Sequence, residues 1–140
     1  MHWIRTFFAA TLCAVACCGA ASETDAPVLI GNASVGRLDV LTVQRLYTGR
    51  AVEVAGMNVT VVNASAGSKL RERFMVEVMN QEDARYVAYW TVRKHIGKGT
   101  PPRELKTAAE VIDFVQTTPG AVGYVAQTDL RPGLNVVLKP

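Results

Sequence analysis

Hydroxyl, glycine and cationic residues gather in one short stretch of this 140-residue chain. Ser65, Gly67 and Ser68 come first, and Lys69 and Arg71 follow directly. Hydroxyl groups and backbone N–H groups hydrogen-bond an oxyanion, and a lysine or arginine adds a charge-assisted contact. We therefore expect these residues to bind a small oxyanion, and we expect neither a metal nor a cofactor.

The pattern around this stretch predicts a strand that leads through a loop into a helix. Val59 to Val62 is a β-branched run, which favours a buried strand. A helix is predicted from Ser68 to near Met79, because serine is a favourable N-cap and apolar residues recur at helical spacing from Leu70 onwards. The N-terminus of such a helix directs N–H groups and positive dipole at one point, where α/β proteins bind anions.

A second interpretation of the cations requires no ligand. Lys69, Arg71 and Arg73 could instead form the exposed face of an amphipathic helix. Ser68 would then cap an ordinary strand–helix turn of the kind that every α/β domain contains. The residue types alone leave both interpretations open.

The sequence offers little that could perform catalysis. His2 lies in the predicted leader, which leaves His95, at a predicted helix end where a positive side chain suits the dipole. Neither an H-x-x-x-H zinc pair nor a G-x-S-x-G nucleophile motif is present. We therefore predict a binding protein rather than an enzyme.

The first 21 residues are typical of an export signal. Arg5 precedes an almost wholly apolar run from Thr6 to Cys18, and Gly19 to Ala21 supplies the small residues that a signal peptidase requires. The run is shorter than the roughly 20 residues of a membrane span. We expect residues 22–140 to form a periplasmic domain without a transmembrane span, and a retained N-terminal anchor is the alternative.

The cysteines and the charge balance agree with an exported domain. All three cysteines, Cys13, Cys17 and Cys18, lie in the predicted leader, so the mature chain would hold no disulfide. A lipid anchor at Cys17 is a second interpretation, although the usual leucine of a lipoprotein signal is missing. Without Arg5 the chain has 14 basic and 12 acidic residues. This small, scattered excess argues against nucleic acid as a partner.

The order of predicted elements indicates an α/β sandwich with a largely parallel sheet. Asn80 is predicted to cap the third helix, and Thr107 with Glu110 forms a capping box for the fourth. An excursion around Gly56 should form a hairpin. The predicted strands are 28–30, 59–62, 121–125 and 134–138, and the predicted helices are 40–47, 68–79, 80–96 and 107–117.

Six segments follow one another in an order that is similar to a known family. They are Leu41–Arg50, Val62–Phe74, Ala88–Trp90, Gly97–Pro102, Ala109–Val115 and Pro119–Val125. The chain resembles the short phosphate ABC transporter substrate-binding-like proteins of bacteria, which belong to the type II periplasmic binding protein superfamily. The resemblance implies a three-layer α/β/α sandwich, equivalent to a single lobe of a two-lobed receptor, with an ABC transporter permease as a partner.

The resemblance also implies phosphate, or a related oxyanion, as the ligand. In the full-length receptors, the loop that corresponds to Asn63–Lys69 begins with an arginine and ends in Ser-Gly-Thr. Ser68 takes the position of that serine, whereas Lys69 and Leu70 replace the glycine and threonine. Ala64 stands where the arginine is expected, and the second lobe has no counterpart in this sequence.

The alternative function is an envelope protein-interaction module that keeps the receptor-lobe fold without binding phosphate. Tyr86, Tyr89 and Trp90 would then form an exposed apolar patch. If they instead pack in the core, this alternative loses its expected surface.

Overall fold

The computed structural model describes residues 23–140 as a layered α/β domain, and the predicted leader, residues 1–21, lies outside them. Its main sheet has five strands in the order β5-β4-β6-β1-β7. These strands are β1 (Pro27–Gly31), β4 (Thr60–Ala64), β5 (Arg103–Leu105), β6 (Ala121–Ala126) and β7 (Asn135–Leu138). The helices are α1 (Val40–Tyr47), α2 (Lys69–Glu77), α3 (Asp83–His95) and α4 (Ala108–Thr117).

Short elements complete the chain. The strands β2 (Glu53–Val54) and β3 (Met57–Asn58) form the predicted hairpin around Gly56. Two 3₁₀ turns, Glu23–Asp25 and Gln127–Asp129, lie next to the ends of β1 and β6. No helix within residues 23–140 has the length and apolar character needed to cross a bilayer.

The strands of the main sheet do not all run in one direction. The strand β4 pairs in parallel with both β5 and β6, whereas β1 pairs antiparallel with both β6 and β7. Four strands therefore share a direction, as a largely parallel sheet requires, and β1 opposes them. The antiparallel placement of β1 was not predicted, because the alternation of strands and helices does not say which strands become neighbours.

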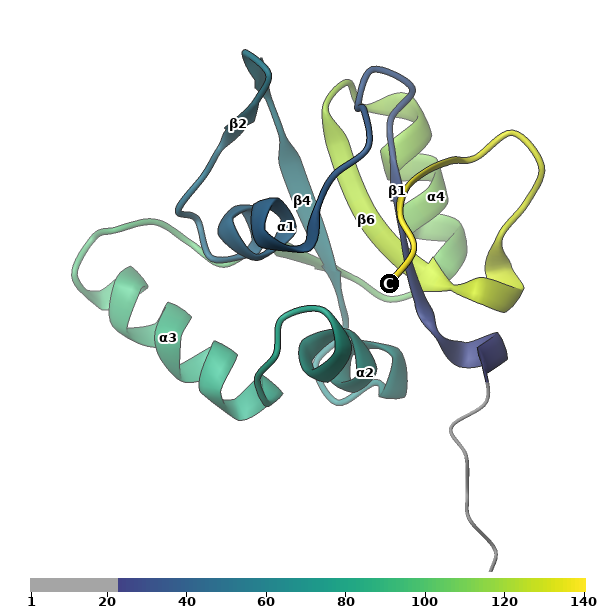
Figure 1. Cartoon of the computed structure of the whole chain (residues 1–140). Coiled ribbons are helices and arrows are strands. Elements are labelled where there is room, and N and C mark those ends of the chain that lie inside the picture. Colours follow the sequence, from purple (N-terminus) through teal and green to yellow (C-terminus); the bar gives the residue numbers. More distant parts are fainter. Residues whose placement is uncertain (1–22) are drawn as a thin grey trace, which may run out of the picture.

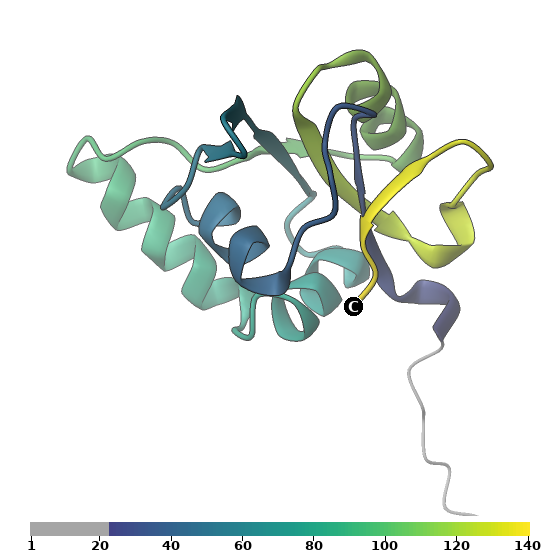
Figure 2. The ribbon, with the colours of Figure 1, turned by 45° about the horizontal axis from the view of Figure 1, so that its top comes forward.

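Helices cover both faces of the sheet. Alternate residues of β1 point to opposite faces, so Leu29 packs with α1, α2 and α3 while Ile30 packs with α4. Both residues are fully buried. Figures 1 and 2 show α4 on the far side of β1 and β6 from the other three helices. The sandwich therefore has the three layers that the sequence predicts.

Two of the three predicted helix caps are confirmed. The Ser68 hydroxyl accepts from the backbone N–H of Arg71 at 3.3 Å, and the Thr107 hydroxyl accepts from that of Glu110 at 3.2 Å. The Glu110 carboxylate accepts from Lys106, one residue before the position of a regular capping box. Both caps depend only on residues three positions apart, which explains why the sequence predicts them.

The predicted Asn80 cap is wrong. Helix α3 begins after Glu82, whose side chain makes no capping hydrogen bond. The N–H of Met79 instead bonds the Phe74 carbonyl, and the N–H of Gln81 bonds the Met75 carbonyl. These bonds close the end of α2 and hold Asn80 at φ 53°, a left-handed conformation that asparagine tolerates.

Candidate functional site

All five predicted site residues lie on the loop after β4 or on the first turn of α2, and four of them are half-buried or exposed. Ser65 and Ser68 are half-buried, and the N–H of Ser68 bonds the Ser65 carbonyl at 3.1 Å. Gly67 is exposed, has φ 81° and has no neighbouring atom where a Cβ would lie. Lys69 is exposed and makes no ion pair within residues 23–140. The loop is therefore open to solvent at Gly67 and Lys69.

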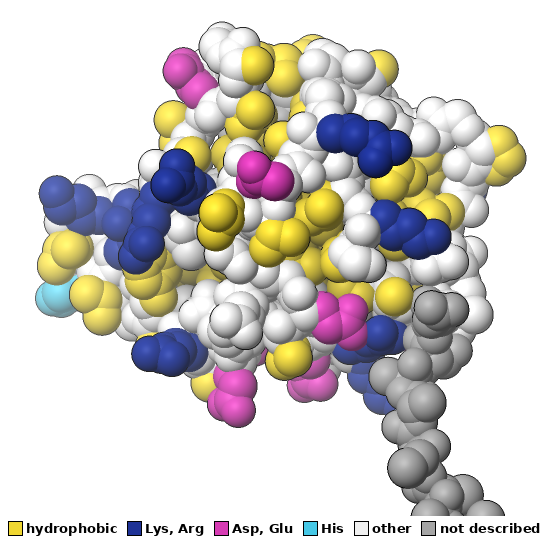
Figure 3. All heavy atoms as spheres, viewed as in Figure 1, with side chains coloured by type: hydrophobic (Ala, Val, Ile, Leu, Met, Phe, Trp, Pro, Cys, Tyr) yellow, Lys and Arg dark blue, Asp and Glu magenta, His cyan; other side chains and the backbone are white. Residues whose placement is uncertain are grey.

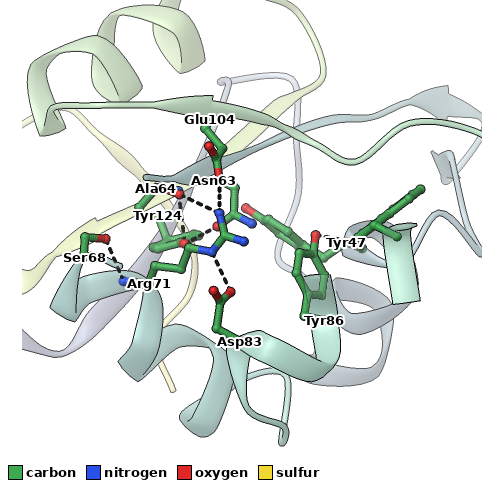
Figure 4. Close-up of polar contacts among 10 residues, drawn as sticks. Tyr47, Asn63, Ala64, Ser68, Arg71, Asp83, Tyr86, Glu104 and Tyr124 are labelled. Atoms are coloured by element: carbon green, nitrogen blue, oxygen red, sulfur yellow. Dashed lines mark hydrogen bonds and ion pairs between the residues drawn. The ribbon is translucent and has the colours of Figure 1, made fainter. Parts of the chain in front are cut away.

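Arg71 lies in a different environment from the other four. It is only 3% exposed, so its interpretation as part of a solvated helix face is wrong. Its Nε donates to Asp83 at 2.7 Å, and its Nη1 donates to the Ala64 carbonyl at 3.2 Å and to Glu104. Figure 4 shows the guanidinium among these groups. Two carboxylates of this chain therefore neutralise the Arg71 charge that was expected to bind an external anion.

The ion pairs of Arg71 join four elements at one edge of the sheet. Arg71 belongs to α2, Asp83 to α3 and Glu104 to β5, and the Ala64 carbonyl ends β4. Burial lowers the pKa of Arg71, but the hydrogen bonds and charges of the two carboxylates outweigh it and leave that pKa raised. Arg71 thus stays charged and positions the loop that precedes Ser68.

A buried polar network continues from this edge into the core. Asn63 is 2% exposed, and its side-chain oxygen accepts from the Tyr124 hydroxyl. That hydroxyl also accepts from the N–H of Ala64 at 3.1 Å, and the Tyr47 hydroxyl donates to the Val62 carbonyl at 2.8 Å. The ring of Tyr124 stacks on Phe74 with centroids 3.9 Å apart. The end of β4 is therefore fixed by tyrosines from α1 and β6.

Sequence reasoning missed this tyrosine network. Tyr124 and Asn63 each stand in a segment that carries the family resemblance, but they are 61 positions apart. A single sequence gives no signal that pairs them, because only the parallel neighbours β4 and β6 bring them together.

The aromatic residues of α3 face inward. Tyr86 and Trp90 are 1% and 6% exposed, and both donate to the Tyr47 carbonyl, at 2.9 and 3.2 Å. Tyr89 is half-buried and donates to the Thr48 carbonyl at 2.8 Å. These residues pack in the core, so the exposed patch expected for an interaction module is not found at these positions.

Burial also changes the acidity of the Tyr86 phenol. Chiefly through burial, the pKa of Tyr86 rises to about 12.

A cavity of about 540 Å³ lies beside Arg71. It is bounded by the end of β4, Arg71 of α2, one side of α3, and the segment from Pro101 to Glu104 that leads into β5. The sequence did not predict it, since its walls come from four separate segments. Among residues 23–140, no group of three or more histidine, cysteine, aspartate or glutamate side chains could hold a metal ion.

Comparison with known proteins gives a likeness in structure only. No protein-family model and no curated protein sequence matches this chain. A structure from Clostridium perfringens, named as a phosphate ABC transporter substrate-binding protein with bound phosphate, matches 81% of this chain with a TM-score of 0.63 and 18% identity. An ABC-type phosphate transport receptor from Vibrio cholerae matches the same share, with a TM-score of 0.56 and 13% identity. PstS from Borrelia burgdorferi has a TM-score of 0.58, 16% identity and again 81% coverage.

The likeness extends over part of each receptor. The matches cover 44%, 45% and 46% of the three receptor chains, so this chain spans less than half of their length. The predicted fold class, one lobe of a periplasmic binding protein-like fold, is confirmed. Because the sequence identities are below 20%, these comparisons show the fold alone. The ligand has to be argued from the site itself.

Proposed function

We propose that this chain is a substrate-binding-like protein that binds phosphate or a related oxyanion at the loop after β4. The observation that carries the proposal is the receptor-lobe fold, which has its strand–loop–helix junction at Ser65–Arg71. One structure that shares the fold is named for phosphate transport and holds phosphate. A binding role also agrees with a sequence that offers no nucleophile–base pair.

Within this loop we assign direct contacts to four residues. The Ser65 and Ser68 hydroxyls and the N–H groups of Gly67 and Lys69 would donate to the anion, and the Lys69 side chain would supply charge. The first N–H groups of α2 have no partner within the helix. Gly67 has no side chain to obstruct the approach. The site is open and carries a single unpaired cation, so its affinity should fall as salt rises.

Arg71 holds the loop in position and is not among the residues that we assign to direct contact with the anion. Its Nη1 holds the Ala64 carbonyl, which fixes the start of the loop. Its Nε and Nη1 already bond carboxylates, so we assign to Arg71 a positioning role and a weak electrostatic contribution. Ala64 itself provides no charge where the resemblance expects an arginine.

The proposal includes export and a transport partner. Residues 1–21 would direct the chain to the periplasm and be removed, leaving residues 22–140 as the mature domain. A lipid anchor at Cys17 is the alternative form of the same protein. An ABC transporter permease is the proposed partner.

The test is calorimetric titration of the protein with inorganic phosphate, and with sulfate, at low and moderate salt. We expect saturable phosphate binding that weakens with salt and falls at least tenfold in Ser68→Ala. Ser68→Ala also removes a helix cap, so Thr107→Ala is the matched control: it removes the equivalent cap of α4, away from the loop. Phosphate binding that is absent, or that Thr107→Ala lowers as much, would refute the proposal.

A second candidate function rests on the outer surface of α3. Val92 and Ile96 lie one turn apart and are 60% and 58% exposed. Such a pair suits a shallow contact with another protein. In Figure 3, dark-blue side chains also gather over the left end of the molecule, where α3 ends. If phosphate binding fails, a periplasmic protein that binds the wild-type chain and not Val92→Glu would support this function.

A further inference from the structure

None of the four proposed oxyanion-contact residues lines the cavity beside Arg71, although Ala66 of the same loop does, and the walls of the cavity have a different character. They are mostly carbon, from the side chains of Tyr86, Val87, Trp90, Pro101 and Pro102. Its volume of about 540 Å³ lies in the range of small-molecule sites, roughly 300–1,000 Å³. Its size and its carbon walls suit a ligand with an apolar body.

A buried cation is among the residues that line this cavity. The Arg71 side chain is 4% exposed, and its Nη2 has no hydrogen-bond partner among residues 23–140, unlike its Nε and Nη1. Among residues 23–140, Arg93 Nε is the one fully buried side-chain nitrogen or oxygen that lacks a hydrogen-bond partner. Arg71 Nη2 also lacks a partner, so it is not fully buried and can be reached from the cavity. Arg71 lines the cavity, so this nitrogen is available to a ligand there.

The charges that line the cavity select the class of ligand. Arg71 and Lys94 are the cations among the lining residues, and Glu104 is the carboxylate among them. Arg71 is already paired with Glu104 and Asp83, so Lys94 is the lining cation that makes no ion pair among residues 23–140. Asp83 is bonded to Arg71 at 2.7 Å and adds negative field close by. A doubly charged anion would be repelled by both carboxylates and would lose hydration against carbon walls. A single carboxylate can pair with Lys94 and accept from Arg71 Nη2 with less repulsion and a smaller loss of hydration.

We propose that this cavity binds a small organic monocarboxylate with an apolar body. The carboxylate accepts from Arg71 Nη2 and is attracted by Lys94, and the apolar body packs on Trp90 and the two prolines. This site is separate from the loop contacts of Ser68 and Lys69, so it does not depend on phosphate binding.

Trp90 provides a direct readout of the cavity. The chain has two tryptophans, so in a Trp3→Phe variant of the full chain all tryptophan fluorescence comes from Trp90. We would titrate this variant with benzoate, with acetate, which lacks the apolar body, and with inorganic phosphate. Benzoate is expected to change the fluorescence saturably, at concentrations at least tenfold below any effect of acetate or phosphate.

Two exposed valines of α3 give a matched pair of variants. Val87 lines the cavity and is 45% exposed, whereas Val92 is 60% exposed and does not line it. Val87→Glu adds a second lining carboxylate and should weaken benzoate binding at least tenfold, while Val92→Glu should leave it unchanged. Lys94→Ala should weaken binding several-fold.

The outcomes separate this proposal from the proposed function. Ser68→Ala should leave benzoate binding intact even where it removes phosphate binding. No saturable response to benzoate in the folded protein would overturn the proposal, and so would equal losses in Val87→Glu and Val92→Glu. Acetate or phosphate binding as tightly as benzoate would also overturn it, because the apolar walls would then contribute nothing.

Discussion

Arg71 illustrates what spacing along the chain does and does not predict. The sequence places it one turn into a helix after a serine cap, and the structure confirms that position. Its partners are Asp83 and Glu104, which lie 12 and 33 positions further along. Helical spacing says nothing about contacts at such separations, so the same residue could be interpreted as an anion ligand or as a solvated side chain.

At the residue scale, replacing Arg71 should destabilise the fold. Arg71→Met leaves the Ala64 carbonyl and two carboxylates without their donor, and we expect a loss of about 2 kcal/mol in the free energy of unfolding. The loss should be smaller than for a fully buried ion pair, because the Glu104 side chain is 47% exposed. Urea denaturation would measure it. Arg85→Met, which removes an exposed arginine of α3, should change stability by no more than about 0.5 kcal/mol.

At the scale of elements, the least predictable feature is how α3 is attached. Its existence follows from the sequence, but its partner does not. Tyr86 and Trp90 both donate to the carbonyl of Tyr47, and Tyr89 donates to that of Thr48, so three aromatic side chains satisfy the C-terminal end of α1. The sequence shows three aromatic residues on a helix, and only the assembled fold shows that they serve another helix.

We expect Trp90→Ala to cost about 3–5 kcal/mol in unfolding free energy, since it removes a large buried ring together with its hydrogen bond to α1. Trp90→Phe keeps most of the ring and should cost less, because it removes the N–H donor and part of the ring volume. Thermal unfolding of the two variants would give the order. A change in Trp90→Ala no greater than in Val92→Ala, at an exposed site on the same helix, would contradict this account.

At the scale of the whole molecule, the sequence predicts the layers better than the sheet order. The strands 28–30, 59–62, 121–125 and 134–138 are confirmed in outline, because buried β-branched and small residues mark them. The short strand β5 was missed, since it follows two prolines and only Leu105 in it is buried. The position of β1 between β6 and β7 depends on residues about a hundred positions apart, such as Ile30 with Gly123 and Val136, and no local pattern encodes it.

The whole core should become unstable at alkaline pH. Burial raises the pKa of Tyr47 and Tyr124 above their usual range and raises that of Tyr86 to about 12. Between an unfolded-state phenol pKa of about 10 and these higher values, the unfolded chain binds fewer protons than the folded one, so stability falls as pH rises.

Tyrosinate absorbance and circular dichroism, followed from pH 9 upwards, would test this expectation. Ionisation of the buried phenols should coincide with loss of structure. Full ionisation of all four tyrosines in a chain that remains folded would contradict the buried placement of Tyr47, Tyr86 and Tyr124.

The pairing of β1 with β7 has a further consequence for how this domain can be connected. Leu29, near the beginning of the described chain, lies opposite Leu138, near its end. Figure 1 shows the C-terminus beside β1. A domain whose two ends leave at one place can be spliced into a surface loop of a host protein with two short connectors, because the host loop needs to open only by the width of two neighbouring strands, about 5 Å. The same geometry allows a host polypeptide to enter this domain, form all of its strands and helices, and leave next to the point where it entered.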